Sequence, residues 1–140
     1  MLHKPTLKAA MSPFPYSIAI DARVEDARHL MSQHNVRHLP VVDGQRLVGI
    51  VSDRDLRVLF CAANIADFKV RDVYVAEPYV VELDTPLECV LGEMADRQIG
   101  AALVTRNGKL AGIFTAVDAC RSFETFLDEA FPAPGPDLRA

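Results

Sequence analysis

The sequence predicts an α/β (α+β) protein built from two similar β-α-β-β-α units. Three observations lead to this prediction: the chain repeats itself, each copy contains a tight-turn signal between two apolar runs, and helical apolar spacing occurs on both sides of that hairpin. An ungapped comparison of the chain with itself at an offset of 63 aligns residues 7–56 with residues 70–119, and ten of the 50 pairs are identical. Self-similarity of this kind indicates one structural unit present twice.

Each unit is expected to begin with a short extended segment followed by an amphipathic helix. The extended segments, residues 17–20 and 80–83, follow Pro-Tyr in both copies. Apolar residues then recur at helical spacing and leave one face to bury. This face consists of Val24, Ala27, Leu30 and Met31 in the first copy and of Leu87, Val90, Leu91 and Met94 in the second. In the second copy Thr85, Pro86 and Glu88 predict a capping box with proline in the first turn, of which the first copy keeps only Glu25.

A β-hairpin and a second helix complete each unit. Residues 36–42 and 99–105 are rich in β-branched and apolar residues and are followed by Asp43-Gly44 and Asn107-Gly108, dipeptides typical of hairpin turns. Residues 47–51 and 110–114 are the expected partner strands. The second helices start at Ser52 and Thr115, and their expected apolar faces are Leu56, Leu59 and Phe60, and Cys120, Phe123 and Leu127. A unit of about 55 residues is marginally stable alone, so we expect the two units to pack sheet to sheet with pseudo-twofold symmetry.

The domain boundaries follow from these patterns. Residues 7–60 form the first repeat, residues 61–69 a connection and residues 70–127 the second repeat. Residues 132–140 contain three prolines and one glycine, which predicts a flexible tail.

Composition and charge exclude several classes of protein. The 140 residues carry 15 Lys and Arg against 19 Asp and Glu, which removes the positive charge that dominates nucleic-acid binding. No apolar run approaches the roughly 20 residues of a membrane helix, and no secretory signal is visible, so we expect a cytoplasmic protein with no membrane partner. Cys61, Cys89 and Cys120 fit neither a disulfide framework nor a zinc site, which predicts reduced, buried thiols.

The strand-to-helix junctions carry the most informative pattern. Gly49 to Asp55 and Gly112 to Asp118 share the form Gly-x-x-Ser/Thr-x-x-Asp. The simple interpretation is a helix N-cap with a glycine that allows close packing. The functional interpretation is a nucleotide site, in which free N–H groups attract an anion, the hydroxyl donates to a phosphate and the carboxylate accepts from ribose hydroxyls.

Arg37 and His38 are further candidates for phosphate binding. Successive residues of a strand point to opposite faces, so at least one of the two faces a cleft or solvent. A nearby phosphate favours protonated His38, and Arg37 can bind phosphate through its planar fork. The simple interpretation is a solvated charge at a sheet edge. The second copy has Gly100-Ala101 here, so the two sites should differ. His34 and His38 do not form a metal site with any carboxylate, and no nucleophile has an evident base.

These residues resemble a tandem pair of cystathionine-β-synthase (CBS) domains, the arrangement often called a Bateman module. The resemblance covers about residues 7–127 and rests on the stretches Met31 to Asp55 and Leu110 to Asp118. It implies two units packed through their sheets, pairing of two chains into a homodimer, and adenosine-containing ligands in the clefts between the repeats. The ligands implied are AMP, ADP, ATP, NAD and S-adenosylmethionine.

The resemblance also implies roles for individual residues. It assigns ribose binding to Asp55 and Asp118, and contacts with ribose or phosphate to Ser52, Thr115, Arg37 and His38. The residues expected to frame the adenine are Tyr16, Ser17, Ile18, Tyr79, Val80 and Val81. Residues 100–103 depart from the family pattern because they lack a basic pair and the proline.

Three functions remain open from the sequence. The leading hypothesis is a regulatory, energy-sensing module: an adenine nucleotide acts as regulatory ligand, the module signals to a separate effector protein by conformational change, and it needs no cofactor, metal or catalytic residue. The alternative is a ligand-free dimerisation or scaffold module in which both junctions are only helix caps. A third possibility is a nucleotide hydrolase using Asp53 or Asp55.

Overall fold

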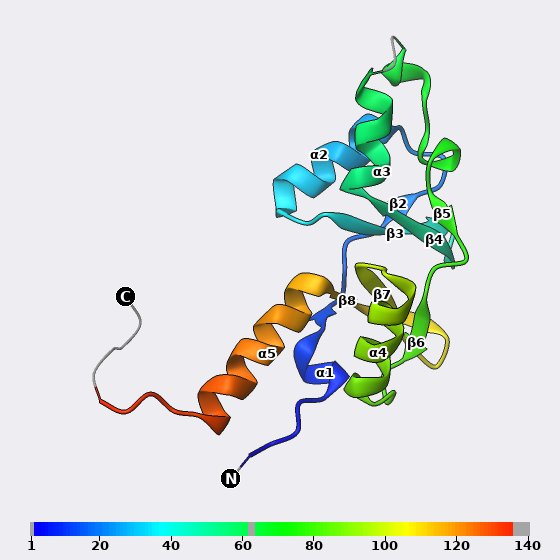
Figure 1. Cartoon of the computed structure of the whole chain (residues 1–140). Coiled ribbons are helices and arrows are strands. Elements are labelled where there is room, and N and C mark those ends of the chain that lie inside the picture. Colours follow the sequence, from blue (N-terminus) through cyan, green and yellow to red (C-terminus); the bar gives the residue numbers. More distant parts are fainter. Residues whose placement is uncertain (1, 62–63, 136–140) are drawn as a thin grey trace.

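The computed structural model describes residues 2–61 and 64–135 and contains the two predicted units, one above the other in Figure 1. The first unit comprises β2 (Ile18–Ala19), α2 (Val24–His34), β3 (His38–Asp43), β4 (Arg46–Ser52) and α3 (Asp53–Arg57). The second comprises β6 (Val80–Glu82), α4 (Leu87–Arg97), β7 (Ala101–Arg106), β8 (Lys109–Thr115) and α5 (Ala116–Ala130). The elements outside these units are α1 (Leu7–Ala10), β1 (Ser12–Pro13), β5 (Val75–Ala76) and the 3-10 turns η1 (Val58–Cys61), η2 (Ile65–Asp67) and η3 (Val70–Asp72). The predicted β-α-β-β-α order is confirmed in both copies.

Each unit has a four-stranded sheet that is completed by a strand from outside its own repeat. The strand orders are β2-β3-β4-β5 and β1-β8-β7-β6. The short β1 pairs antiparallel with β8 of the second unit, and β5 pairs antiparallel with β4 of the first. Leu7, placed in the first repeat by sequence, is buried in the core of the second unit. The packed units therefore do not have the same boundaries as the sequence repeats.

The glycine of each junction motif makes room for the strand that comes from the other repeat. These exchanged strands are β5, which pairs with β4, and β1, which pairs with β8. Gly49 lies opposite Ala76 in the β4–β5 ladder, and a Cβ atom on Gly49 would lie 2.4 Å from the carbonyl oxygen of Val75. Gly112 lies opposite Pro13, and its Cβ would lie 3.0 Å from the carbonyl oxygen of Ser12. A side chain at either position would collide with a neighbouring backbone, so the two glycines serve close packing.

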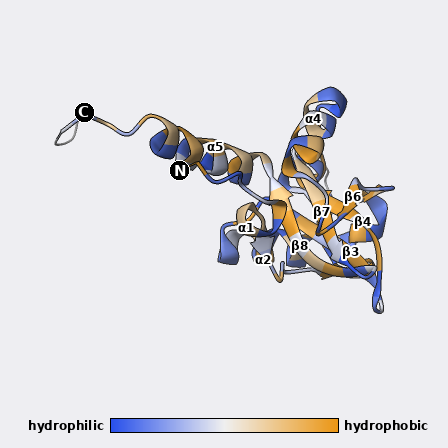
Figure 2. Cartoon of the chain, turned by 90° about the horizontal axis from the view of Figure 1, so that it is seen from below, coloured by the Kyte–Doolittle hydropathy of each residue, from blue (hydrophilic) through white to orange (hydrophobic). Residues whose placement is uncertain are grey.

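Burial on both faces of the strands shows that the two sheets cover each other. Leu39 and Val41 of β3 are in the core of the first unit, beneath its helices. Pro40 lies between them and therefore points to the opposite face, yet it is fully buried. In β7, Leu103 between Ala102 and Val104 repeats this pattern. Figure 1 shows the strands of both units toward the middle of the molecule, and Figure 2 shows that these strands are its most apolar part.

The hairpin turns differ from the prediction in the first copy. Asn107 and Gly108 both have positive φ and form the two-residue turn of the second hairpin. In the first hairpin Asp43 still pairs with Arg46, so the turn residues are Gly44 and Gln45, of which only Gly44 has positive φ. A turn with glycine in its first position needs positive φ only there. The predicted Asp43-Gly44 turn is thus shifted by one residue.

Three expectations about the helices are wrong. Helix α4 has Pro86 as its N-cap with no side-chain cap bond, so Thr85 and Glu88 form no capping box, and Glu88 instead forms an ion pair with Lys4. Leu91 is exposed, although Leu87, Val90 and Met94 are buried as predicted. No residue of α5 is buried, so its expected apolar face remains accessible. The physical reason is that α5 extends away from the sheet beyond its first turns (Figure 1).

The three cysteines are free, but all of them are exposed rather than buried. Cys89 lies in α4, Cys120 lies in α5, and Cys61 ends η1. Residues 62–63 of the connection, residues 136–140 of the expected tail and the side chain of Phe60 lie outside the described part of the structure. Within that part, no helix is long and apolar enough to cross a membrane.

Candidate functional site

A cleft of about 670 Å³ lies between the two units and is lined by both of them. The first unit contributes the start of β3 and the β4–α3 junction, with Arg37, His38, Ser52 and Asp55. The second contributes the chain after β5, the end of α4 and the start of β7, with Tyr79, Arg97 and Gly100. The fold thus brings together four of the predicted ligand-binding residues of the first repeat and one predicted adenine-framing residue of the second.

Ser52 and Asp55 hold each other in place at the start of α3. The Asp55 backbone N–H donates to Ser52 Oγ at 3.1 Å, and the Ser52 backbone N–H donates to Asp55 Oδ2 at 2.8 Å. This reciprocal capping box confirms the simple interpretation of the motif. The capping box uses only one oxygen of the Asp55 carboxylate, because Oδ1 accepts no hydrogen bond from the described residues. Asp55 lines the cleft, so its carboxylate can offer this acceptor to a ligand there.

His38 is the most buried basic group of the cleft. Burial lowers its pKa, and Arg37 lowers it further, while Asp55 and Asp53 act in the opposite direction. The ring approaches the second unit: a Cβ on Gly100 would lie 3.7 Å from His38 Nε2. An anion in the cleft would raise the lowered pKa again, because it favours the charged imidazolium. His38 can therefore couple ligand binding to proton uptake.

Tyr79 and Arg97 form the wall on the side of the second unit. The Arg97 guanidinium carbon lies 5.1 Å from the centre of the Tyr79 ring, within the range of a cation–π contact. Desolvation raises the pKa of Tyr79, and nearby Glu93 adds to this effect. No sequence pattern pointed to Arg97 as a site residue. The sequence signal that could have identified Arg97 is its position. It lies four residues before the start of β7, and the repeat alignment pairs it with His34.

Thr115 and Asp118, which match Ser52 and Asp55 in the second copy, do not line this cleft. Asp118 caps α5 with Thr115, and its Oδ2 accepts from the Thr115 backbone N–H at 3.0 Å. Its other carboxylate oxygen accepts from Ser12 Oγ at 3.4 Å, so both oxygens already have donors within the chain. Asp118 also borders a smaller cavity of about 340 Å³ between the N-terminal segment and α5.

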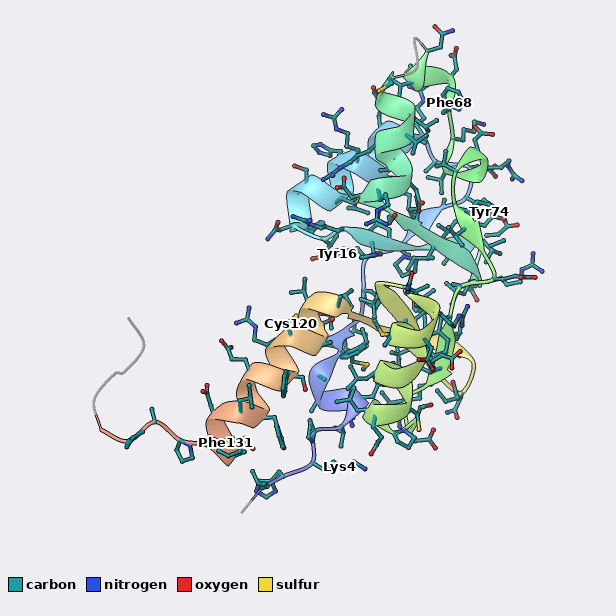
Figure 3. All side chains as sticks on the ribbon, viewed as in Figure 1. Lys4, Tyr16, Phe68, Tyr74, Cys120 and Phe131 are labelled. Atoms are coloured by element: carbon teal, nitrogen blue, oxygen red, sulfur yellow. The ribbon has the colours of Figure 1, made fainter. Side chains whose placement is uncertain are left out.

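Tyr16, the counterpart of Tyr79, stacks on a side chain of its own unit. Its ring centre lies 3.7 Å from that of His34, with an angle of 13° between the ring planes. Figure 3 shows Tyr16 at the junction of the two units. Ser17 and Ile18 follow it and, like Val80 and Val81, are not among the residues lining the large cleft. The side chain of Val81 belongs to the core of the second unit.

Comparison with known proteins shows similarity over both repeats. The model of the CBS domain family matches residues 7–60 and 70–124. The protein YlbB of Bacillus subtilis is 39% identical over 113 residues, which cover 79% of this chain and 76% of that protein. Inosine-5′-monophosphate dehydrogenase of Thermoplasma acidophilum is 37% identical over 103 residues, which cover 74% of this chain and 20% of the dehydrogenase. The chain therefore spans about a fifth of that enzyme.

Solved structures share the whole arrangement. The structure of CBSX2 in complex with AMP is 28% identical, has a TM-score of 0.74, and the match covers 86% of this chain and 96% of that one. The CBS domain pair of protein MJ0100, in complex with 5′-methylthioadenosine and S-adenosyl-L-methionine, is 25% identical with a TM-score of 0.76, and the match covers 88% and 98% of the two chains. The fold and the repeat are thus those of a CBS domain pair.

Proposed function

Because the chain belongs to the CBS domain family, we propose that it is a regulatory module that binds an adenosine-containing ligand in the cleft between its two units. The candidates are AMP, ADP, ATP, NAD and S-adenosylmethionine. The observation that carries this proposal is the cleft of about 670 Å³ in which Ser52 and Asp55 of one unit lie with Tyr79 of the other. Family and fold are those of CBS regulatory domains, which in inosine-5′-monophosphate dehydrogenases form one part of an enzyme.

The groups of the cleft match the parts of an adenine nucleotide. In this proposal Asp55 Oδ1 accepts a ribose hydroxyl, since its Oδ2 is already used in the cap. Arg37 and His38 bind phosphate oxygens, and the half-buried Tyr79 ring packs against the base. The ligands of CBSX2 and of the MJ0100 domain pair contain adenosine, which supports this class of ligand.

A ligand in this cleft would act on the relative position of the two units. Because its contacts come from both units, it binds one arrangement more tightly than another and shifts the population toward it. We infer that a separate effector protein responds to this change. We also infer a homodimer, since α5 buries none of its residues within the chain and Phe123 and Leu127 are 60% and 40% exposed.

Calorimetric titration of the purified chain with each of the five candidates tests this proposal. At 100 times the dissociation constant a ligand stabilises the fold by about 2.7 kcal/mol, which a thermal-shift measurement detects. Asp55→Asn should weaken binding at least about tenfold, because a ribose acceptor loses its charge. Asp118→Asn removes the matching capping acid of the other copy and should leave affinity within about twofold.

Two results would count against the proposal. A protein stripped of bound nucleotide that responds to none of the five ligands would favour the scaffold alternative. Equal affinities for the parent chain and the Asp55→Asn variant would place the ligand elsewhere. Turnover of ATP or NAD by the purified chain would instead indicate the hydrolase alternative.

A further inference from the structure

We propose that the cleft selects a nucleotide with a chain of several phosphates, and that Arg97 binds this chain from the second unit while Arg37 and Arg54 bind it from the first. This inference rests on the proposed function and specifies the ligand of the same site. It concerns the charge of the ligand rather than its adenosine part.

Arginines outnumber acidic residues by one in the lining of the cleft, although the chain is negative overall. Four arginines line it, namely Arg37, Arg54, Arg57 and Arg97, against the acids Asp53, Asp55 and Glu77. The whole chain has a formal net charge of −4. Arg57 pairs with Asp53 in a salt bridge of 2.8 Å, and Asp55 accepts the cap hydrogen bond while keeping its negative charge. Within residues 2–61 and 64–135, the other three arginines form no salt bridge.

Comparison with the second copy shows that the fold does not require these arginines. At the offset of 63, the positions of Arg37, Arg54 and Arg57 are taken by Gly100, Val117 and Cys120, and that of Arg97 by His34. The second copy builds the same strands, hairpin and capped helix without the three guanidinium groups of the first unit, and the first copy builds its helix α2 with His34 in place of Arg97. Arginine is the side chain best suited to bind phosphate oxygens in pairs. Its accumulation in one cleft only therefore indicates a phosphate-rich ligand there.

Arg97 gives this subsite a contact from across the cleft. It is the last residue of α4, and its guanidinium lies over the Tyr79 ring, which keeps the charge at the wall of the second unit. Arg37 and Arg54 belong to the first unit. A triphosphate has enough oxygens to contact guanidinium groups on both sides, whereas a monophosphate next to the ribose has few. We therefore expect ATP to bind more tightly than ADP, and ADP more tightly than AMP.

Calorimetry with ATP, ADP, AMP, S-adenosylmethionine and inorganic tripolyphosphate tests this order. In the parent chain we expect ATP to bind at least about tenfold more tightly than AMP, the effect of roughly one added charge-assisted contact. Arg97→Gln should reduce this ratio by about tenfold and leave AMP affinity nearly unchanged. Arg106→Gln is the matched control. Arg106 is exposed at the far end of β7 and does not line the cleft, and its substitution removes the same charge from the same unit.

Further variants separate charge from stacking. Arg97→Lys keeps the charge and should retain most of the preference for ATP, and raised salt should weaken ATP more than AMP. An equal loss of ATP and AMP binding in both Arg97 variants would overturn the proposal, because it would show a role in wall packing. AMP or S-adenosylmethionine binding as tightly as ATP would also overturn it while leaving the proposed function intact. Tripolyphosphate should compete with ATP, and a failure to compete would count against a phosphate subsite.

Discussion

The two units of this chain share their framework and differ in the residues around it. Both contain a parallel pair, a hairpin with an irregularity at the same place in its first strand, and a second helix capped by a hydroxyl and an aspartate. They differ in the exchanged strand that meets the capping aspartate: Ser12 of β1 donates to Asp118, whereas the matching residue of β5 is Val75, which has no hydroxyl. Asp55 Oδ1 consequently accepts no hydrogen bond from the described residues.

This difference shows where the sequence was free to change. Positions with backbone contacts, such as Gly49 and Gly112, are identical in the two copies because a side chain would collide with the exchanged strand. Positions at the cleft are not under that constraint. The pair Tyr79 and Arg97 corresponds to Tyr16 and His34, which keeps an aromatic contact in both copies but places a permanent charge in one of them only.

The largest effect that we expect comes from filling the space at the exchanged strands. Gly49→Ala should lower the free energy of unfolding by about 3 kcal/mol, because its Cβ would meet the Val75 carbonyl and the Tyr74 ring. Gly112→Ala should cost less, about 1 to 2 kcal/mol, because its closest contact is the flexible Met11 side chain. Urea unfolding monitored by circular dichroism measures both values.

Gly92→Ala provides the control for these two variants. Gly92 lies in α4 with open space around its Cβ position, so alanine should stabilise the chain by about 0.5 to 1 kcal/mol. Equal effects of the Gly49 and Gly112 substitutions would show that the two exchanged strands are held in the same way, contrary to the geometry.

A smaller effect is expected from removing the two capping hydroxyls. Ser52→Ala and Thr115→Ala should each lower stability by about 1 kcal/mol, since each leaves a helix N–H without its side-chain acceptor. The two substitutions should differ in how much they increase local opening of the helix that each residue caps. Helix α3 is anchored by the buried Leu56, whereas α5 buries no residue, so amide exchange in the first turn should increase more in α5.

Thr115→Ser keeps the hydroxyl and should restore protection in α5. If Thr115→Ala left exchange in that turn unchanged, the cap would contribute nothing to the order of this helix.

The smallest effect concerns pH and is confined to the first copy, because His38 corresponds to Ala101. Burial lowers the pKa of His38 in the folded chain below its unfolded value of about 6.5. The unfolded chain therefore binds more protons in this range, and stability falls as the pH decreases from 6.5 toward the folded pKa. Urea unfolding at several pH values should show this slope, and His38→Gln should remove it.

Ligand binding should have the opposite pH dependence. An anion in the cleft raises the lowered pKa of His38, so binding takes up a proton and strengthens as the pH falls through that range. Calorimetry in two buffers of different ionisation enthalpy measures this proton uptake. Zero uptake in the parent chain would show that His38 does not contact the anion.

Local sequence patterns were sufficient for most of the fold. Helical spacing, the Asn107-Gly108 turn and the Ser52–Asp55 box each act within a few residues, so their physical causes are visible in a short stretch of chain. The same patterns found Arg37, His38, Ser52 and Asp55 at the cleft, but not Arg54 or Arg57. They failed where a local motif met a competing partner, as at Glu88, whose carboxylate pairs with Lys4 instead of capping α4.

The sequence by itself determined the repeat, the order of strands and helices, and the candidate residues Ser52 and Asp55, because these depend on neighbours along the chain. Only the tertiary structure decided that β1 and β5 are exchanged between the sheets, since strands of two residues have no alternation to read. It also decided which aspartate remains available and that Arg97 meets Tyr79 across the cleft from Arg37. These contacts join residues far apart in sequence, and their spacing is set by the packing of one unit on the other.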